Sequence, residues 1–250
     1  MKAIITSAGL GTRMKHVTSI IPKALLPLFK KEGNSIVTEP MIDLIMDYLE
    51  AVNIQDFCIV VGAHGRVLLE HLYDRGATFV VQKEPKGFGD AVLRAERFAN
   101  SSPVFVHADD GLLVGGYSAG VKLFENKNAD GVVFVRRVPN PSRYGIATLK
   151  PLGTFMDHAY YEVTNAEEKP KEPKSDYALI AAYVFSSKIF EALKSVSIVS
   201  GELELTYGIQ KLIEGDGKVY AIEIGKNEKW LNVGDPASYL DSLQYSYANL

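Results

Sequence analysis

The stretch MKAIITSAGLGTRM, residues 1–14, decides the fold class of this chain. Its first part, Lys2 to Thr6, is rich in β-branched apolar residues and predicts a buried strand. Gly9 and Gly11 follow at once, and two such glycines let the backbone turn sharply and approach a phosphate or a base closely. The chain therefore opens with a strand and a loop suited to bind a nucleotide.

The loop lacks the residues of the two common nucleotide motifs. A dinucleotide-binding fingerprint requires a third glycine where this chain has Met14, and a P-loop requires Gly-Lys-Ser/Thr at its end. The loop instead offers the hydroxyl of Thr12 and the fixed cation of Arg13, and Pro22-Lys23 follows. Two cations near one glycine loop suit a triphosphate, whose charge must be neutralised before an anion can attack it.

Further along, short apolar runs alternate with segments of helical spacing. The predicted strands are 57–61, 78–82, 104–107 and 132–138, and the predicted helices are 36–52, 66–74, 90–98 and 118–125. This alternation predicts an α/β fold with a mostly parallel, Rossmann-like sheet flanked by helices. Ligands of such sheets bind at the carboxyl ends of the strands.

The pattern changes after Val138. Strands are expected at 144–149, 160–163 and 177–185 without long helices between them, which indicates a small antiparallel extension. Residues 169–175 read as a polar, proline-rich loop, and helices are expected at 187–194, 203–214 and 236–247. We therefore expect one domain over residues 1–250, with a nucleotide-binding core over about 1–138 and the extension and C-terminal helices over about 139–250.

Composition narrows the partners. The chain has 47% hydrophobic and 23% charged residues and a formal net charge of -3, which argues against a nucleic-acid-binding surface. Cys58 is the only cysteine and lies in an apolar run, so a buried thiol is expected rather than a disulfide. The N-terminal apolar run is too short for a signal peptide, and no window suits a bilayer span. We expect a cytoplasmic protein without a membrane partner.

Several motifs, taken together, resemble the signature of the sugar-1-phosphate nucleotidyltransferases, which include glucose-1-phosphate uridylyltransferases and thymidylyltransferases. They are AGLGTRM at 8–14, Pro22-Lys23, Gln82 with GFGDA at 87–91, Asp109, Tyr144-Gly145, EEKP at 167–170, GELE at 201–204 and WLNVG at 230–234. The matches run in family order over nearly the whole chain. The resemblance implies a Rossmann-like nucleotide-binding core with a sugar-binding extension.

The resemblance also implies roles in nucleotide binding. The loop would cradle the base and phosphates through Ala8, Gly9, Leu10, Gly11 and Thr12. Arg13 would hold the β- and γ-phosphates, Lys23 would lie near the α-phosphorus, and Gln82 and Gly87 would contact the base edge.

The remaining implied roles concern the metal and the sugar. Asp109 would bind Mg²⁺, with Asn232 in the place of a second family aspartate. Asp110 stands where relatives often have a neutral residue and is a weaker candidate ligand. Asp235 is an alternative to Asn232. The sugar 1-phosphate site would contain Tyr144, Gly145, Glu168, Lys169 and Leu179, with Lys169 on the phosphate and Glu168 on sugar hydroxyls.

The implied activity transfers a nucleoside monophosphate from a triphosphate to a sugar 1-phosphate and releases pyrophosphate. The glycine-rich motifs look closer to the uridylyltransferase form, which favours UTP and glucose 1-phosphate, with dTTP as the alternative. A non-catalytic nucleotide-sugar sensor is a second alternative, motivated by Asn232, and an interaction module in a larger assembly is a third. A homo-oligomer is expected.

Overall fold

A nine-stranded sheet forms the centre of the molecule in the computed structural model, which describes residues 1–9, 11–14, 16–63, 65–197 and 201–250. The strand order is β5-β4-β1-β6-β11-β8-β12-β10-β9. The strands are β1 (Lys2–Ser7), β4 (Phe57–Val61), β5 (Thr78–Val81), β6 (Val104–Ala108), β8 (Gly131–Arg137), β9 (Gly145–Phe155), β10 (His158–Glu168), β11 (Tyr177–Phe185) and β12 (Val219–Glu223). The predicted α/β class is confirmed.

One half of the sheet is parallel. β1 pairs in parallel with both β4 and β6, and β4 pairs in parallel with β5. Every residue of β4 is buried, as the continuous apolar run predicts for a strand covered on both faces. The strands expected over 57–61, 78–82 and 104–107 are therefore confirmed, and their carboxyl ends share one edge with the glycine loop.

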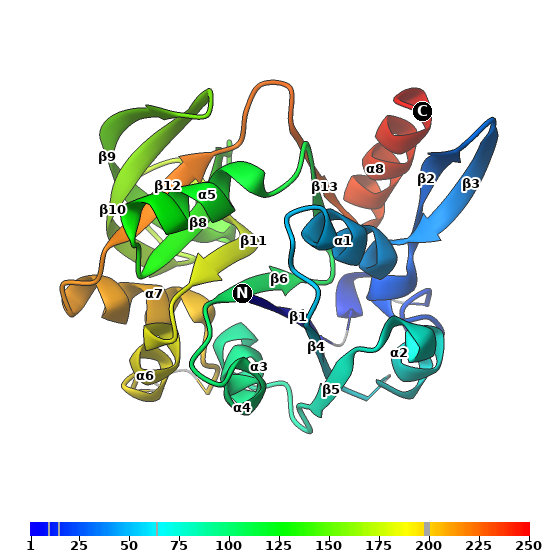
Figure 1. Cartoon of the computed structure of the whole chain (residues 1–250), viewed down its shortest axis with the longest axis horizontal. Helices are drawn as coiled ribbons and strands as arrows, with labels where there is room; N and C mark the ends of the chain where they lie inside the picture. Colours follow the sequence, from blue (N-terminus) through cyan, green and yellow to red (C-terminus); the bar gives the residue numbers. More distant parts are fainter. Residues whose placement is uncertain (10, 15, 64, 198–200) are drawn as a thin grey trace.

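The other half is largely antiparallel and continues the same sheet. β11 pairs antiparallel with β6 on one side and with β8 on the other, so it joins the two halves. β10 pairs antiparallel with β9 and β12, which lie at the left of Figure 1. The sequence reading missed β12 because its short apolar run follows a helix in a region where only helices are expected.

Helices cover both faces of the sheet (Figure 1). They are α1 (Met41–Glu50), α2 (Gly65–His71), α3 (Phe88–Arg94), α4 (Glu96–Ala99), α5 (Ser118–Lys127), α6 (Lys188–Lys194), α7 (Leu205–Glu214) and α8 (Pro236–Ala248). Ile5 of β1 packs into a core with α1 and α5, whereas the neighbouring Ile4 packs into a second core with α3, α6 and α7. Because successive side chains of a strand point to opposite faces of the sheet, one strand contributes residues to both cores. Across the described ranges, no helix is both long and apolar enough to cross a membrane.

The helix predicted over 36–52 is wrong at its start. Residues Ser35–Pro40 form β3, which pairs with β2 (Pro27–Glu32), and α1 begins only at Met41. Gly33, with φ of 59°, supplies the left-handed residue of the tight turn between the two strands. The apolar spacing of α1 and the extended residues before it merge into one pattern in the sequence.

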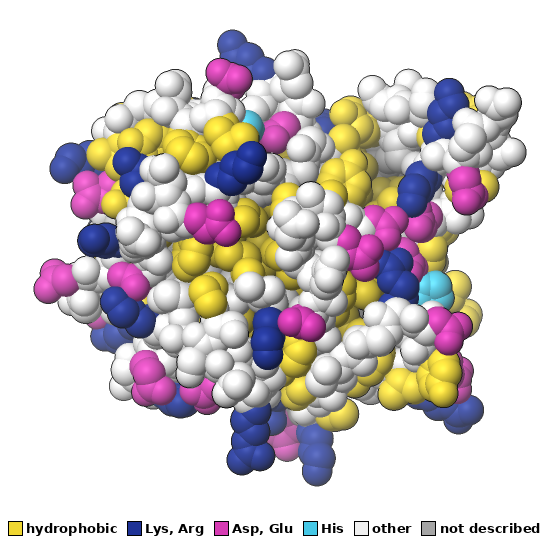
Figure 2. Space-filling view, in the orientation of Figure 1, with side chains coloured by type: hydrophobic (Ala, Val, Ile, Leu, Met, Phe, Trp, Pro, Cys, Tyr) yellow, Lys and Arg dark blue, Asp and Glu magenta, His cyan; other side chains and the backbone are white. Residues whose placement is uncertain are grey.

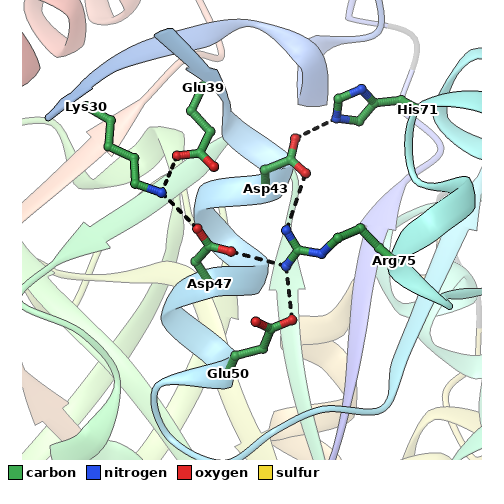
Figure 3. A network of polar contacts seen from close by, with 7 residues as sticks. All are labelled: Lys30, Glu39, Asp43, Asp47, Glu50, His71 and Arg75. Carbon is green, nitrogen blue, oxygen red and sulfur yellow. Dashed lines mark hydrogen bonds and ion pairs between the residues drawn. The ribbon is translucent and has the colours of Figure 1, made fainter. Parts of the chain in front are cut away.

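A network of ion pairs ties this hairpin to α1 and α2 (Figure 3). Lys30 of β2 pairs with Asp47 of α1 at 3.0 Å, and Arg75 pairs with Asp47 at 3.1 Å and with Glu50 at 3.0 Å. Asp43 of α1 contacts His71 at 2.5 Å. In Figure 2, acidic, basic and histidine side chains gather in this part of the surface. The network anchors the segment that follows Lys23.

A second pair of short strands was also missed. β7 (Gly111–Val114) and β13 (Lys229–Asn232) form an antiparallel ribbon in which Asn232 lies opposite Gly111. Four-residue strands give little sequence signal. The ribbon nevertheless carries Asn232 to the end of β6.

Candidate active site

A pocket of about 370 Å³ lies at the carboxyl ends of β1 and β6. Its lining combines the glycine loop, the loop before α3, the end of β6 and the segment before α7. The lining residues are Thr6, Ala8, Gly9, Arg13, Lys23, Gln82, Pro85, Gly87, Phe88, Ala91, Ala108, Asp109, Asp110, Glu202 and Glu204. The predicted cations Arg13 and Lys23 therefore share one cavity with the predicted metal ligands.

Lys23 pairs with two carboxylates at the bottom of this pocket. Its Nζ lies 2.9 Å from Asp110 Oδ2 and 3.7 Å from Asp109 Oδ1, and its side chain is only 14% exposed. Burial acts to lower the pKa of Lys23, but the charges of Asp110 and Asp109 outweigh it and hold that pKa above its usual value. Burial likewise acts to raise the pKa of Asp110, and the Lys23 ammonium brings it below its ordinary range. Lys23 and Asp110 are thus both held in their charged forms.

Asp109 is fixed by groups of β1. The hydroxyl of Ser7 donates to its Oδ2 at 2.5 Å, and its backbone N–H donates to the carbonyl oxygen of Thr6 at 3.2 Å. Burial raises the pKa of Asp109, with Lys23 acting in the opposite direction. The two neighbouring aspartates therefore differ, because Asp110 has the closer contact with the ammonium.

His107 lies behind the aspartates rather than in the pocket. It is fully buried, and burial lowers its pKa to about 4, so the imidazole is neutral at pH 7. Its Nδ1 lies 2.6 Å from the carbonyl oxygen of Ala108 and must donate, so its Nε2 accepts from the hydroxyl of Tyr117 at 2.7 Å. That hydroxyl in turn accepts from the backbone N–H of Leu113 at 3.3 Å. The histidine thereby links β6 to β7.

Asn232 faces the same cluster from β13. A methyl group built on Gly234 would lie 2.8 Å from Asn232 Oδ1, 3.1 Å from Asp110 Oδ2 and 3.4 Å from Arg13 Nη2, so these three groups surround one point. Asn232 Oδ1 also accepts from the backbone N–H of Gly234 at 2.8 Å. Asp235, the alternative to Asn232, instead caps α8 by accepting from the N–H of Ser238 at 3.0 Å.

The oxygen atoms in and beside the pocket are of the kinds that Mg²⁺ prefers as ligands. Magnesium prefers one or two carboxylates, with phosphate oxygens and water in its other positions, and Asp109, Asp110 and the amide oxygen of Asn232 are available. The described residues hold no cluster of three His, Cys, Asp or Glu ligands, so a full protein cage for a metal is absent from them. The pocket lining carries four carboxylates against the two cations Arg13 and Lys23. A triphosphate therefore requires an additional positive charge to enter this pocket.

Some residues of the glycine loop line the pocket, and others lie behind it. Ala8 and Gly9 line the pocket, whereas Gly11 lies behind the loop and its carbonyl oxygen accepts from the hydroxyl of Thr18 at 2.7 Å. Gly11 has φ of 62°, and a Cβ there would lie 2.8 Å from Thr18 Cβ, so glycine is required. Thr12 is exposed and does not line the pocket. Leu10, the remaining loop residue of the prediction, lies outside the described residues.

The predicted base-edge residues adjoin one another. Gln82 follows β5, and its Nε2 donates to the carbonyl oxygen of Gly87 at 3.2 Å. Gly87 has φ of 100°, and a Cβ there would lie 2.5 Å from the carbonyl oxygen of Leu203. Glycine is needed here because the backbone before α3 packs directly on the segment before α7.

The predicted sugar-phosphate residues form a neighbouring group. A methyl group on Gly145 would lie 3.0 Å from Glu168 Oε2 and 3.1 Å from Leu179 Cδ1, so these three residues converge. The backbone N–H of Lys169 donates to the carbonyl oxygen of Tyr144 at 3.0 Å. The side chain of Tyr144 is exposed.

Lys169 does not line the 370 Å³ pocket. Its Nζ lies 3.1 Å from Glu168 Oε1. Burial acts to lower the pKa of Lys169, but the hydrogen bond that its ammonium donates to Glu168, together with the charges of Glu168, Glu204 and Glu202, raises that pKa above the usual value. Because Glu202 and Glu204 do line the pocket, Lys169 lies at its border.

Sequence reasoning missed three polar residues of the site. The hydroxyl of Ser7 donates to Asp109, and the hydroxyl of Thr206 donates to Glu168 at 2.7 Å. Burial, followed by the charge of Glu168, raises the pKa of Glu204. The motif GELELT at 201–206 contains Glu204 and Thr206, and the available signal was the alternation of two glutamates with two leucines that are buried in the structure.

The fold and this pocket, in which Arg13 and Lys23 stand among four carboxylates, fit the class of nucleotidyl transferases. The chain belongs to the nucleotidyl transferase family, whose model matches residues 2–247. It is 31% identical to the low-salt glycan biosynthesis nucleotidyltransferase Agl11 of Haloferax volcanii, over 98% of this chain and 65% of that protein. It is 29% identical to a glucose-1-phosphate thymidylyltransferase of Streptomyces griseus, over 96% of this chain and 64% of that protein.

A uridylyltransferase is similar at the same level. The UTP--glucose-1-phosphate uridylyltransferase of Mycoplasma pneumoniae is 29% identical over 90% of this chain and 85% of that protein. The chain thus spans slightly less than two thirds of the length of the first two relatives and 85% of the third. Among solved structures, a UDP-glucose pyrophosphorylase complexed with UDP-glucose superposes with a TM-score of 0.84 at 22% identity, over 100% of this chain and 99% of that one, which supports the fold.

Proposed function

We propose that this protein transfers a nucleoside monophosphate from UTP to a sugar 1-phosphate, with glucose 1-phosphate as the favoured acceptor, and releases pyrophosphate. The observation that carries the proposal is the placement of Arg13 and Lys23 in one pocket with Asp109 and Asp110, beneath a glycine loop. Names of relatives such as the uridylyltransferase of Mycoplasma pneumoniae support the reaction class.

The reaction needs no protein nucleophile. An oxygen of the sugar phosphate attacks the α-phosphorus, a new P–O bond forms, and the bond to the β-phosphate oxygen breaks so that pyrophosphate leaves with the electron pair. Lys23 neutralises charge at the α-phosphate, and Arg13 holds the β- and γ-phosphates. Bound Mg²⁺, held by Asp109, Asp110 and Asn232, would add the positive charge that the acidic pocket lacks.

The acceptor site would be built by the neighbouring group. Glu168, whose Oε2 accepts from Thr206, would accept from sugar hydroxyls, and Gly145, which has no side chain, allows Glu168 and Thr206 to approach the backbone closely. Lys169 would bind the sugar phosphate, and Tyr144 and Leu179 would complete the walls. Ala8 and Gly9, which line the pocket, would contact the nucleotide through their backbone.

Thymidylyl transfer is the second candidate. It is supported by the similarity to the thymidylyltransferase of Streptomyces griseus, which has the same identity as the uridylyltransferase relative. A non-catalytic sensor is the third, since Asn232 is a weaker metal ligand than a carboxylate and Lys23 already pairs with both aspartates.

We further propose that the protein is a cytoplasmic homo-oligomer. Light scattering coupled to gel filtration would test its oligomeric state in solution.

Pyrophosphate release separates these candidates. The assay uses UTP, dTTP, CTP and GTP with glucose 1-phosphate or other sugar 1-phosphates, with and without Mg²⁺. Release that requires both substrates and the metal is expected, with UTP the best donor. Faster release with dTTP would replace UTP in the proposal, and tight nucleotide-sugar binding without release from any pair would support the sensor.

A further inference from the structure

The orientation of the Gln82 side chain is fixed by its neighbours. Gln82 is only 4% exposed, and its Nε2 donates to Asp90 Oδ2 at 2.7 Å as well as to the Gly87 carbonyl oxygen at 3.2 Å. Asp90 lies in the first turn of α3 and also accepts from Arg94, with distances of 2.8 Å to Nε and 3.2 Å to Nη2. Three donors therefore converge on one carboxylate.

The chemistry of these partners excludes the flipped amide. A backbone carbonyl and a carboxylate paired with a guanidinium only accept hydrogen bonds. The amide nitrogen of Gln82 must therefore face Asp90 and Gly87, and both of its hydrogens are used. Within the described part of the chain, no group donates to Gln82 Oε1, and Gln82 and Gly87 both line the nucleotide pocket. The amide thus offers that pocket an acceptor and no donor.

We propose that Asp90 is a positioning residue for base selection. By holding the Gln82 amide nitrogen, it makes Oε1 the only polar group that Gln82 presents, and this favours a base with a ring N–H at the paired edge. Uracil and thymine carry such a donor at N3, whereas cytosine has a lone pair at N3 that would face Oε1. The inference rests on the proposed function for the place of the base, and it favours bases with a ring N–H, such as uracil and thymine, over cytosine.

Asp90→Asn tests the proposal. An asparagine amide can accept or donate a hydrogen bond, so it would allow the side-chain amide of Gln82 to flip. We expect the ratio of UTP to CTP affinity to fall by about tenfold or more, since one buried mismatched polar contact has that effect. Equilibrium binding of UTP, dTTP and CTP in the presence of Mg²⁺ measures the ratio without requiring turnover. Affinity for inorganic tripolyphosphate, which has no base, is expected to stay unchanged.

Asp47→Asn is the matched control. Asp47 also pairs with an arginine, at 3.1 Å, but lies on α1 in the network of Figure 3 and does not line the nucleotide pocket. It is expected to keep the wild-type UTP to CTP ratio. Asp90→Ala, which removes the acceptor altogether, serves as the second variant if thermal melting finds the asparagine protein unfolded.

The outcomes separate this inference from the reaction. A folded Asp90 variant that keeps the wild-type ratio, or a wild-type protein that binds CTP as well as UTP, would overturn the role of Asp90. A relaxed ratio in an enzyme that releases no pyrophosphate would leave the role of Asp90 standing and remove the proposed function.

Discussion

The two lysines proposed to contact substrate phosphates lie in opposite environments. Lys23 is 14% exposed and pairs with Asp109 and Asp110, whereas Lys169 is 59% exposed and pairs with the single carboxylate of Glu168. The nucleotide side of the site is therefore built before any ligand arrives. The acceptor side keeps a cation in solvent that a sugar phosphate would draw inward.

The backbone around each lysine follows the same division. Lys23 begins a short 3-10 helix whose Ala24 is fully buried, next to the parallel half of the sheet. Lys169 follows β10 with φ of 43°, at the start of the polar loop. Rigid packing fixes a side chain at low entropic cost, while an exposed lysine loses rotamer freedom on binding. Substitutions at the two positions should differ in what they damage.

Lys23→Met is expected to have the largest effect. It leaves two adjacent buried carboxylates without their cation, so unfolding free energy should fall by about 3 kcal/mol. The loss of charge at the α-phosphate should also lower kcat/KM by about 10²–10³-fold. Chemical denaturation and pyrophosphate release measure the two effects.

Lys194→Met provides the control for Lys23→Met, because Lys194 makes two close ion pairs, to Glu96 at 2.6 Å and to Glu191 at 2.8 Å, but on the surface. It should leave the unfolding free energy close to that of the wild-type protein, because solvent screens these exposed pairs. Equal losses in the two variants would contradict the special status of the buried pair.

Lys169→Met should damage acceptor binding alone. We expect KM for the sugar 1-phosphate to rise by about 10–100-fold, the range for losing one charge-assisted hydrogen bond, with nucleotide affinity unchanged. Stability should change by less than about 1 kcal/mol because the lysine is exposed. Lys174→Met, which removes an ion pair to Glu167 at 3.2 Å in the same loop, should leave both substrates unaffected. A matching loss of UTP affinity in Lys169→Met would place that lysine on the nucleotide side instead.

Asn232→Asp tests whether position 232 belongs to the same metal site as Asp109 and Asp110. A new carboxylate near Asp110 should tighten Mn²⁺ binding, used as a paramagnetic probe for Mg²⁺, on the order of tenfold. Repulsion from Asp110 should lower the melting temperature of the metal-free protein by about 2–4 °C. Asn227→Asp adds the same charge at an exposed loop position and should change neither quantity. Unaltered Mn²⁺ affinity in Asn232→Asp would remove position 232 from the metal site.

Local patterns were sufficient to predict much of the fold. The strand over Tyr177–Phe185 has the predicted bounds, and β4 and β6 follow from continuous apolar runs. The hairpin of β2 and β3 was missed because Ile36 and Val37 extend the apolar pattern of α1 into an extended segment. A strand that starts inside an apparent helical pattern is decided by pairing with a partner strand, which local spacing does not contain.

The sequence pointed to several residues that line this pocket, but not to Ser7 or Thr206 and not to the contacts among the side chains. Arg13 and Lys23 were expected near one glycine loop, and the resemblance to the family implied that Asp109 belongs to the same site. Two features depend on side-chain distances that the sequence does not contain. Lys169 lies outside the pocket that Arg13 and Lys23 line, and Asp90 accepts a hydrogen bond from Gln82. Asn232 reaches Asp110 only through the β7–β13 ribbon, which carries too little sequence signal to be foreseen.

The smallest expected effect concerns the hydrophobic core beneath the nucleotide side of the site. Cys58 of β4 is fully buried, and burial raises the pKa of its thiol from 9.0 to about 12. Above pH 9 the unfolded chain therefore loses a proton that the folded protein keeps, so this stabilising contribution is present below pH 9 and declines as pH rises toward 12. Between pH 8 and pH 10, the wild-type protein should lose about 1.4 kcal/mol more unfolding free energy than Cys58→Ala. Titrating lysines and tyrosines are common to both proteins, so the difference between them isolates the thiol, and a gap that stays constant with pH would mean that the thiol is accessible to water in the folded state.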